Sequence, residues 1–384
     1  MSRRVFILGS TGSIGCSTVE VIEHLRSIDG DGSWPVIGIS AGSNCELLLQ
    51  QATRLNVEAI AIANKAAIEF KNIFSNSEEL LKAHAKQGDI VVAAIVGFAG
   101  VAPVLTAIEC GCDIALANKE TLVASGEIIM KAVQEAGVRL LPVDSEHSAI
   151  YQALSEHPNA EIAKITLTAS GGSLRNIKTE DLSNATVEQV LNHPTWSMGA
   201  KVTVDSASLM NKALELIEAR WLFDVKDDRL EAVIHPQSIV HGMVQFVDGS
   251  VIAQMSPPDM KLPIQFALTY PRRVDGCSPK IDWANHPTLQ FEAIDEIRHP
   301  AIQLAYDVIR LGGTAGAVFN AANEEVVESF LEHSLPFGAM VPIVAEVLGT
   351  ITHSENVTLE AVVAKDTEAR ELTRKIISSQ KVNS

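Results

Sequence analysis

Hydrophobic and polar residues alternate along residues 1–145 between short β-branched runs and longer amphipathic stretches. Apolar runs separated by helical stretches predict parallel strands joined by crossover helices. The six candidate strands are VFIL (5–8), PVIGI (35–39), VEAIAI (57–62), DIVVAAI (89–95), DIALA (113–117) and RLLPV (139–143). We therefore predict a doubly wound sheet, and we expect its ligands to bind beyond the carboxyl ends of the strands.

The pattern changes after residue 145. Residues 146–270 mix helical stretches with strand-like sequences, which are KITLTAS, KVTVDSA and VHGMVQFVDGSVIAQM. From residue 298 onward helical periodicity dominates, and residues 271–297, rich in proline and charge, read as a surface linker. The predicted class is α/β, with an N-terminal doubly wound domain (1–145), a central α+β catalytic domain (146–270) and a C-terminal helical bundle (298–384).

Composition, net charge and cysteine content limit the class of protein. The 384 residues are 47% apolar and 20% charged, which is typical of a folded chain with more than one domain. The formal net charge of −17 counts against nucleic acid as a partner. The five cysteines are scattered, so we expect reduced thiols rather than a disulfide framework.

Two features bear on the compartment. The N-terminus enters a strand-like run at once, so we expect no signal peptide and a cytoplasmic location. The stretch from Ile90 to Ile108 is uncharged over 19 residues and formally reaches membrane-spanning length. It contains Gly97, Gly100 and Pro103, so a buried strand, a turn and a helix are predicted there instead, without membrane attachment.

A glycine-rich loop, residues 9–15 (GSTGSIG), follows the first candidate strand and precedes a helical stretch. Such a loop presents backbone N–H groups to a phosphate at a helix N-terminus, as in Rossmann-like domains. The spacing is GxxGxxG rather than GxGxxG, so a plain tight turn stays open. Residues 40–44 lack the acid that holds a ribose 2′-hydroxyl, which favours NADPH, although only Arg54 offers a nearby positive charge.

Acidic residues suggest a metal site. Asp144 and Glu146 follow the last strand, and at i and i+2 on extended backbone they project to one side. The alternative is a helix start with Asp144 or Ser145 as N-cap. Glu215 shares a helix face with Asn211 and Lys212, although an ordinary surface Lys–Glu pair has the same spacing. Carboxylates without clustered Cys or His suit Mg²⁺ or Mn²⁺.

Two loops are rich in groups that bind anions. Residues 169–173 and 204–208 offer hydroxyls and N–H groups to a phosphate, although both are also ordinary loops and caps. Residues 193–199, which contain Trp196 and Met198, are typical either of a lid over a substrate or of a tryptophan held in a core. Lys119 follows a strand end and either faces an oxyanion or lies on the surface. His235 and His241 are assigned no role.

Several longer motifs resemble the 1-deoxy-D-xylulose 5-phosphate reductoisomerases, and they occur in that family's order. They are GSTGSIG, ALANKETLV, PVDSEHSAI, ASGGSLR, HPTWSMGAKVTVDSASLMNKALELIEA, HPQSIVHGMVQF and FNAANEEVV. The resemblance implies NADPH, a divalent cation and a phosphosugar substrate, which is rearranged through retro-aldol and aldol steps and then reduced to 2-C-methyl-D-erythritol 4-phosphate. It also implies a homodimer.

The resemblance assigns roles residue by residue. The metal ligands would be Asp144, Glu146 and Glu215, and these would act in catalysis with Lys119 and His193. Besides Lys119, His193 and the ligands Glu146 and Glu215, the substrate would contact Ser145, Ser170, Trp196, Ser206, Asn211 and Lys212. The cofactor would contact Thr11, Gly12, Ser13, Ile14, Gly42, Asn44, Asn118, Glu120, Met198 and Gly199.

The chain departs from the family pattern at a few positions. Ser43 stands where some members have a basic residue, Ala213 replaces a common glycine, and Ser173-Leu174 replaces a frequent Pro-Phe. None of these changes removes a side chain with an assigned role. Two alternatives remain: a metal-independent NADP-dependent dehydrogenase of a small phosphorylated metabolite, and a non-catalytic NADPH-sensing module.

Overall fold

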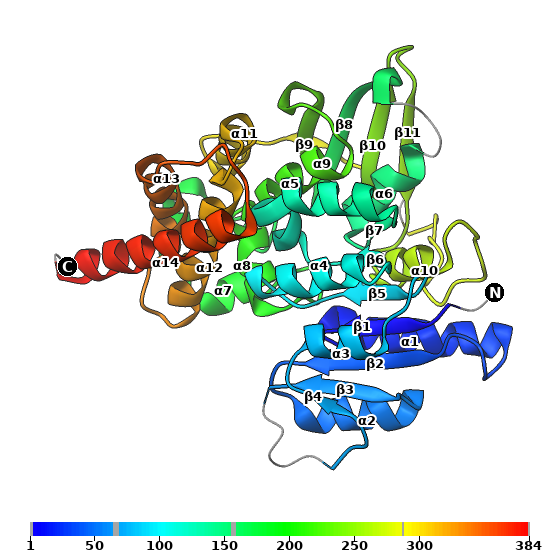
Figure 1. The fold of residues 1–384 in the computed structure, drawn as a ribbon. Helices are drawn as coiled ribbons and strands as arrows, with labels where there is room; N and C mark the ends of the chain where they lie inside the picture. The colour runs from blue at the N-terminus through cyan, green and yellow to red at the C-terminus, as the bar shows by residue number, and fades with distance from the viewer. Residues whose placement is uncertain (1–2, 64–68, 155–158, 286–287, 383–384) are drawn as a thin grey trace. The chain divides into compact units, whose positions relative to one another are not determined.

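The computed structural model describes residues 3–63, 69–154, 159–285 and 288–382 (Figure 1). Its contacts divide the chain into two compact units. The first contains Met1–Thr121, Ile129–Ser148 and Asp259–Ile281, and the second contains Leu122–Ile128, Ala149–Pro258 and Asp282–Ser384. This division departs from the predicted boundaries, because residues 259–281 pack with the first unit and the terminal helices pack with the second.

The first unit is built on a seven-stranded parallel sheet in the order β4-β3-β2-β1-β5-β6-β7. The strands are β1 (Val5–Leu8), β2 (Val36–Ala41), β3 (Ala59–Ile62), β4 (Ile73–Phe74), β5 (Ile90–Ala93), β6 (Asp113–Leu116) and β7 (Leu140–Pro142). All six predicted strands are confirmed. The seventh, β4, is an edge strand of two residues, too short to show a periodicity. The strand order reverses between β1 and β5. Sheets of this kind bind their ligands at such a reversal, outside the carboxyl ends of the strands.

Helices flank this sheet. They are α1 (Ser13–Asp29), α2 (Cys45–Leu55), α3 (Ser77–His84), α4 (Val101–Glu109), α5 (Lys119–Ala136) and α10 (Lys261–Thr269). Helix α1 packs against α2 and α10, whereas α3 packs against α4. The uncharged stretch 90–108 forms β5, the short turn η1 (Phe98–Gly100) and α4, as predicted. Within the described residues no helix is both long and apolar enough to cross a membrane.

The second unit contains a mixed five-stranded sheet in the order β11-β10-β8-β9-β12. Its strands are β8 (Ile162–Ala169), β9 (Leu230–Ile234), β10 (Val240–Phe246), β11 (Val251–Met255) and β12 (Glu292–Ala293). β8 and β9 are parallel, and the other pairs are antiparallel. The predicted strands at 164–170 and 240–255 are confirmed. Part of the predicted surface linker is the short strand β12, which pairs with β9.

The prediction of a strand at 201–207 (KVTVDSA) is wrong, because these residues form helix α8 (Ala200–Ala207). The hydroxyl of Thr203 donates to the carbonyl of Gly199 four residues earlier, and Lys201 forms an ion pair with Asp205 one turn later. Both contacts exist only in a helix, where a threonine can bond back in this way. Helix α8 lies between α7 (Val187–Leu191) and α9 (Met210–Leu222).

The terminal helices share one hydrophobic core with this sheet. They are α11 (Ala301–Leu311), α12 (Ala315–Leu331), α13 (Met340–Thr350) and α14 (Leu359–Val382), and α6 (Ser145–Leu154) precedes β8. Short 3-10 turns connect the elements: η2 (Asn159–Glu161), η3 (Thr179–Asn184), η4 (Asp227–Arg229) and η5 (Phe337–Ala339). Helix α12 is buried on nearly every side and packs against α8, α11, α13 and α14. A helix that is buried on nearly every side lies at the centre of its bundle, so α12 organises the predicted C-terminal bundle.

Candidate active site

The glycine-rich loop lies at the switch point of the first sheet. Gly9 has a φ of +82°, and a Cβ added there would lie 2.5 Å from the carbonyl oxygen of Ala94, which follows β5. A Cβ on Gly15 would lie 2.4 Å from the carbonyl oxygen of Gly9, so the loop must fold tightly on itself. Gly12 is the N-cap of α1 and carries no side-chain cap. The first-turn N–H groups of α1 therefore receive no side-chain cap from Gly12, as an anion site requires.

The loop after β2 offers fewer groups to a cofactor than the sequence suggested. Gly42 is exposed with open space around it, and the carboxamide of Asn44 caps α2 by accepting from the N–H of Leu47. Arg54 lies in the last turn of α2 and forms an ion pair with Glu23 of α1. With a rise of about 1.5 Å per residue, this is the far end of the helix from Ser43. The suggestion that Arg54 supplies a positive charge there is therefore wrong.

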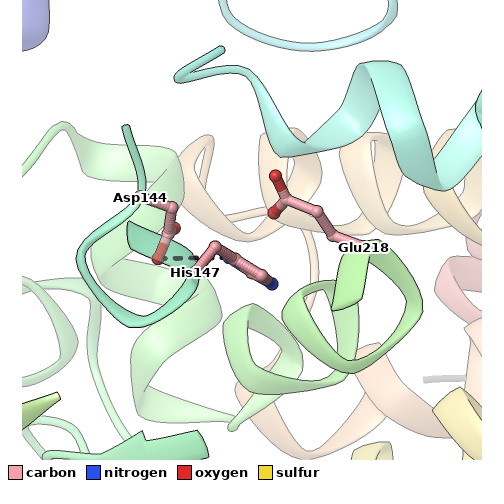
Figure 2. Close-up of side chains that lie close together, drawn as sticks. All are labelled: Asp144, His147 and Glu218. Carbon is pink, nitrogen blue, oxygen red and sulfur yellow. Dashed lines mark ion pairs between the residues drawn. The ribbon is translucent and has the colours of Figure 1, made fainter. Parts of the chain in front are cut away.

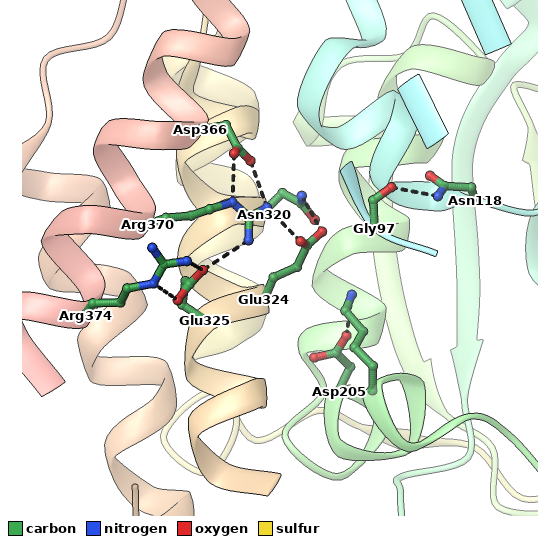
Figure 3. Close-up of polar contacts among 10 residues, drawn as sticks. Gly97, Asn118, Asp205, Asn320, Glu324, Glu325, Asp366, Arg370 and Arg374 are labelled. Atoms are coloured by element: carbon green, nitrogen blue, oxygen red, sulfur yellow. Dashed lines mark hydrogen bonds and ion pairs between the residues drawn. The ribbon is translucent and has the colours of Figure 1, made fainter. Parts of the chain in front are cut away.

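Asn118 fixes the start of α5 after β6. Its Oδ1 accepts from the N–H of Thr121, and its Nδ2 donates to the carbonyl oxygens of Ile95 and Gly97. Figure 3 shows the contact with Gly97. The side chain thus ties the loop after β5 to the loop after β6. Lys119 and Glu120, the next two residues, are both buried.

Asp144, two residues after the end of β7, is the centre of a polar cluster in the first unit. Its Oδ2 lies 2.7 Å from Nζ of Lys119, and its Oδ1 lies 3.5 Å from Nδ1 of His147 (Figure 2). The Ser145 hydroxyl donates to Oε2 of Glu146 at 2.5 Å. The alternative of a surface lysine is therefore wrong for Lys119, because it is 7% exposed and its ammonium pairs with the carboxylate of Asp144.

The extended-backbone argument for Asp144 and Glu146 is wrong, since α6 begins at Ser145 and Glu146 lies in its first turn. Oδ1 of Asp144 accepts from the N–H of Glu146 at 3.3 Å, as an N-cap does. The predicted alternative, a helix start capped by Asp144, is confirmed. Both carboxylates nevertheless remain at the carboxyl edge of the sheet. Glu218, also drawn in Figure 2, belongs to α9 of the second unit.

In the second unit, Ser170 follows β8 and is held by several contacts. Its Oγ lies 3.0 Å from Nε2 of His193 and accepts from the N–H of Gly172 at 3.2 Å. The guanidinium of Arg175 donates to the carbonyl oxygen of Ser170 at 3.1 Å. Burial, and then the charge of Arg175, lower the pKa of His193 from its ordinary value. Arg175 is the last residue of the motif ASGGSLR, but the sequence alone gave it no role.

The segment 192–199 has no regular structure apart from local turns. Nδ1 of His193 accepts from the backbone N–H groups of Thr195 and Trp196. The half-buried Trp196 ring meets the ring of His241 edge to face, with centroids 6.1 Å apart. Met198 is half-buried, and Gly199 is exposed as the N-cap of α8. The segment is therefore anchored at both His193 and Trp196.

The turn from α8 to α9 brings the remaining predicted groups together. Leu209 adopts a φ of +57° at this turn, and α9 begins at the next residue. Asn211 Nδ2 and Lys212 Nζ donate to the two carboxylate oxygens of Glu215, as the shared helix face predicted. Lys212 and Glu215 are 3% and 1% exposed, so the alternative of an ordinary surface pair is wrong.

The loop of Ser170 and the end of α8 are adjacent. Gly172 has a φ of +71°, and a Cβ there would lie 2.5 Å from the carbonyl oxygen of Ser206. Only glycine fits this approach, which sets the backbones that carry Ser170 and Ser206 side by side. The second unit thus gathers two hydroxyls, an amide and an ammonium, which suits a phosphate monoester.

The parallel sheet with its glycine-rich loop at the switch point is typical of dinucleotide-dependent α/β oxidoreductases. Models of the 1-deoxy-D-xylulose 5-phosphate reductoisomerase family match residues 5–126, and those of its C-terminal domains match residues 140–223 and 255–372. The chain belongs to this family of NADP-dependent reductoisomerases.

Individual relatives agree over the whole chain. A reductoisomerase of Pelotomaculum thermopropionicum is 44% identical over 98% of this chain and 98% of its own length. One of Rhizobium etli is 45% identical over 91% and 90%. The solved Zymomonas mobilis enzyme in complex with NADPH is 38% identical, with a TM-score of 0.90 over 99% of this chain and 100% of its own. A reductoisomerase structure with NADPH, fosmidomycin and magnesium is 35% identical, with a TM-score of 0.91 over 99% of both chains.

Proposed function

We propose that the chain converts 1-deoxy-D-xylulose 5-phosphate to 2-C-methyl-D-erythritol 4-phosphate, using NADPH and a divalent cation, in isoprenoid precursor biosynthesis. The observation that carries the proposal is the buried Lys212–Glu215 pair, which follows the Ser206 helix and stands beside the Ser170 loop. In this proposal one turn of α9 supplies both a group that binds the phosphate, Lys212, and a carboxylate that binds the cation, Glu215. Relatives that match over nearly the whole chain support the same reaction.

The first unit fits NADPH. The uncapped N-terminus of α1 and the close approaches at Gly9 and Gly15 form a cradle of backbone N–H groups for a pyrophosphate. Thr11, Gly12, Ser13 and Ile14 would line it. Further contacts are proposed for Gly42, Asn44, Asn118, Glu120, Met198 and Gly199.

The donor set fits Mg²⁺ or Mn²⁺. We assign Asp144 and Glu146 of the first unit and Glu215 of the second as ligands of one divalent cation. All three offer carboxylate oxygens, the donors that hard cations prefer. Lys119 and Lys212 neutralise Asp144 and Glu215 in the structure, and the ammonium groups are free to turn to substrate oxygens once a cation takes over that task.

The residues of the chain bind and orient the substrate. Ser170, Ser206, Asn211 and Lys212 hold its phosphate, remote from the reacting carbons, so binding energy there serves positioning. Ser145 and Lys119 contact its oxygens. When bound, NADPH supplies the hydride and the cation polarises the substrate carbonyl.

In this proposal the loop 193–199 closes over the bound substrate. His193 donates from Nε2 beside the phosphate, and Trp196 excludes water from above the substrate. Because both residues are anchored through the His193 ring, the loop closes as one piece.

We further propose a homodimer that acts on small molecules in the cytoplasm. The net charge of −17 opposes binding to nucleic acid or to an anionic membrane surface.

The deciding experiment follows NADPH oxidation by absorbance with 1-deoxy-D-xylulose 5-phosphate, with added Mg²⁺ and again after EDTA. Oxidation that needs both substrate and cation supports the proposal. Oxidation of another phosphorylated metabolite without a cation would identify a simple dehydrogenase, and NADPH binding without any turnover would identify a sensing module.

A further inference from the structure

A buried pair of side chains joins the terminal helices to α8. Asn323 of α12 and Asp205 of α8 are both 0% exposed, and Asn323 Nδ2 donates to Asp205 Oδ1 at 3.0 Å. Within the described part of the chain, Oδ1 of Asn323 has no hydrogen-bond partner. A buried amide that leaves its acceptor unused is costly, so the bond to Asp205 must be what this side chain provides.

Asp205 is held from a second side. Nζ of Lys201, one turn earlier on α8, lies 2.8 Å from its Oδ2. The carboxylate is thus fixed between a cation on its own helix and an amide on α12. Charge-assisted contacts of this kind fix both position and orientation.

The position of Asp205 sets the position of its neighbours. Ser206 is the next residue, and its carbonyl oxygen is the atom against which Gly172 packs. The carbonyl oxygen of Asp205 accepts from the Ser208 hydroxyl, which in turn accepts from the N–H of Met210 at the start of α9. A shift of Asp205 therefore moves Ser206 and the turn that leads to Asn211 and Lys212.

We propose that Asn323 is a positioning residue for the substrate phosphate: through Asp205 it places Ser206 and the start of α9. The proposal rests on the proposed function, which assigns the phosphate to these residues. The terminal helices then take part in substrate binding without touching the substrate. The alternative is that the pair only fastens α12 to α8.

The test compares Asn323→Asp with a matched control, Asn320→Asp. Asn320 lies one turn earlier on α12, is equally buried, and donates to Glu324 rather than to Asp205. Each variant places a carboxylate opposite an existing one, so both lose stability. Only Asn323→Asp should raise the KM for 1-deoxy-D-xylulose 5-phosphate, by about tenfold or more, which corresponds to about 1.4 kcal/mol. Its kcat should change by less than about threefold, since the reacting groups stay in place.

Two further readouts separate positioning from fastening. The KM of Asn323→Asp should recover as the pH falls, because the paired carboxylates then share a proton. The double variant Asp205→Asn, Asn323→Asp restores one amide and one carboxylate with their places exchanged. It should therefore bring the KM back to within a few-fold of the wild type. If Asn323→Asp does not fold, Asn323→Ala removes the same bond without adding charge and should show the same rise in KM.

Direct binding makes the result independent of turnover. Calorimetry with inorganic phosphate, without NADPH or cation, should show weaker binding to Asn323→Asp than to Asn320→Asp. Equal phosphate affinities and equal KM values for these variants, or no rescue by the exchange, would overturn the proposal. A wild type that binds phosphate but does not turn over the substrate would contradict the proposed function, and the phosphate measurements would still decide the role of Asn323.

Discussion

Nε2 of His193 lies 3.0 Å from Oγ of Ser170, and Nδ1 of the same ring accepts two backbone N–H groups. Because Nδ1 is an acceptor, the hydrogen of the neutral ring is on Nε2 and is donated to Ser170. Oγ of Ser170 also accepts from the N–H of Gly172. The hydroxyl hydrogen of Ser170 therefore points away from both donors, which suits the substrate phosphate that we propose for this loop.

This arrangement predicts a pH dependence. Burial, and then the charge of Arg175, hold the pKa of His193 below its ordinary 6.5. A ring whose pKa is lowered by folding stabilises the fold above the unfolded pKa, and this contribution is lost as the pH falls through the folded pKa. Substrate KM should therefore be constant from about pH 8 to 6.5 and should rise only below 6.5, once Nδ1 is protonated and opposes the two N–H groups.

The matched variant is His193→Gln, which keeps a donor but loses the ring acceptor. It should show a KM raised by about tenfold. The ratio of the two KM values removes the titration of the substrate phosphate, which is common to both proteins. A ratio that changes mainly above pH 6.5 would contradict the assignment of a lowered pKa.

Glu215→Gln tests the proposed cation ligand. The amide preserves the shape but loses a negative charge, so turnover at saturating Mg²⁺ should fall by about a hundredfold or more, while NADPH affinity stays within about twofold. The control is Glu231→Gln, whose carboxylate bonds Lys164 and Thr166 on the sheet of the same unit. Wild-type turnover in Glu215→Gln would show that Glu215 is not a ligand.

Gly15→Ala tests the proposed binding of NADPH to the glycine-rich loop. The added methyl group would lie 2.4 Å from backbone atoms of Gly9 and Ser10, so the loop must move. We expect NADPH affinity to fall by about tenfold, with little change in the binding of inorganic phosphate to the second unit. Gly32→Ala serves as control, because a Cβ there meets nothing within 4 Å. Unchanged NADPH titration of Gly15→Ala would separate the loop from cofactor binding.

Much of the fold could be predicted because its signals are local. Each of the six predicted strands of the first sheet is a continuous and almost fully buried run, and the motifs at 9–15, 144–147 and 211–215 each lie within one loop or helix turn. Helix α8 was not predicted, since its β-branched residues favour a strand until contacts such as Lys201–Asp205 and the packing on α12 decide otherwise.

The contacts that hold the candidate site residues in place join residues that are far apart in the sequence. Asp205 and Asn323 are 118 positions apart, and no periodicity announces their hydrogen bond. The motif FNAANEEVV contains Asn323, but its resemblance to a family gives no physical role until α12 is packed against α8. The helix that begins at Ser145 also orients the carboxylates of Asp144 and Glu146. The prediction of an extended backbone at these residues did not include that helix.

A partly buried charge network fastens α14 to α12 and should stabilise the terminal helices (Figure 3). The guanidinium of Arg370 donates to Asp366, Glu324 and Glu325, at 2.7 Å for the first two and 3.3 Å for Glu325. Asp366 and Glu325 are 6% and 4% exposed. Burial raises the pKa of Asp366 despite this guanidinium, and the same contacts raise the pKa of Arg370.

Arg370→Met should therefore lower the free energy of unfolding by about 3–5 kcal/mol at pH 7.5, because it leaves the buried carboxylate of Asp366 without its partner. Glu325 keeps its two contacts with Arg374 in this variant. A carboxylate whose folded pKa is raised is penalised above that pKa, and the penalty falls as the pH drops and the group takes up a proton. The deficit measured by urea unfolding should thus shrink toward pH 5. Arg310→Met, which removes an exposed partner of Asp227, should cost under about 1 kcal/mol at either pH. Equal losses for the two variants, or a deficit that grows on acidification, would mean that α14 is held by its apolar contacts and not by Arg370.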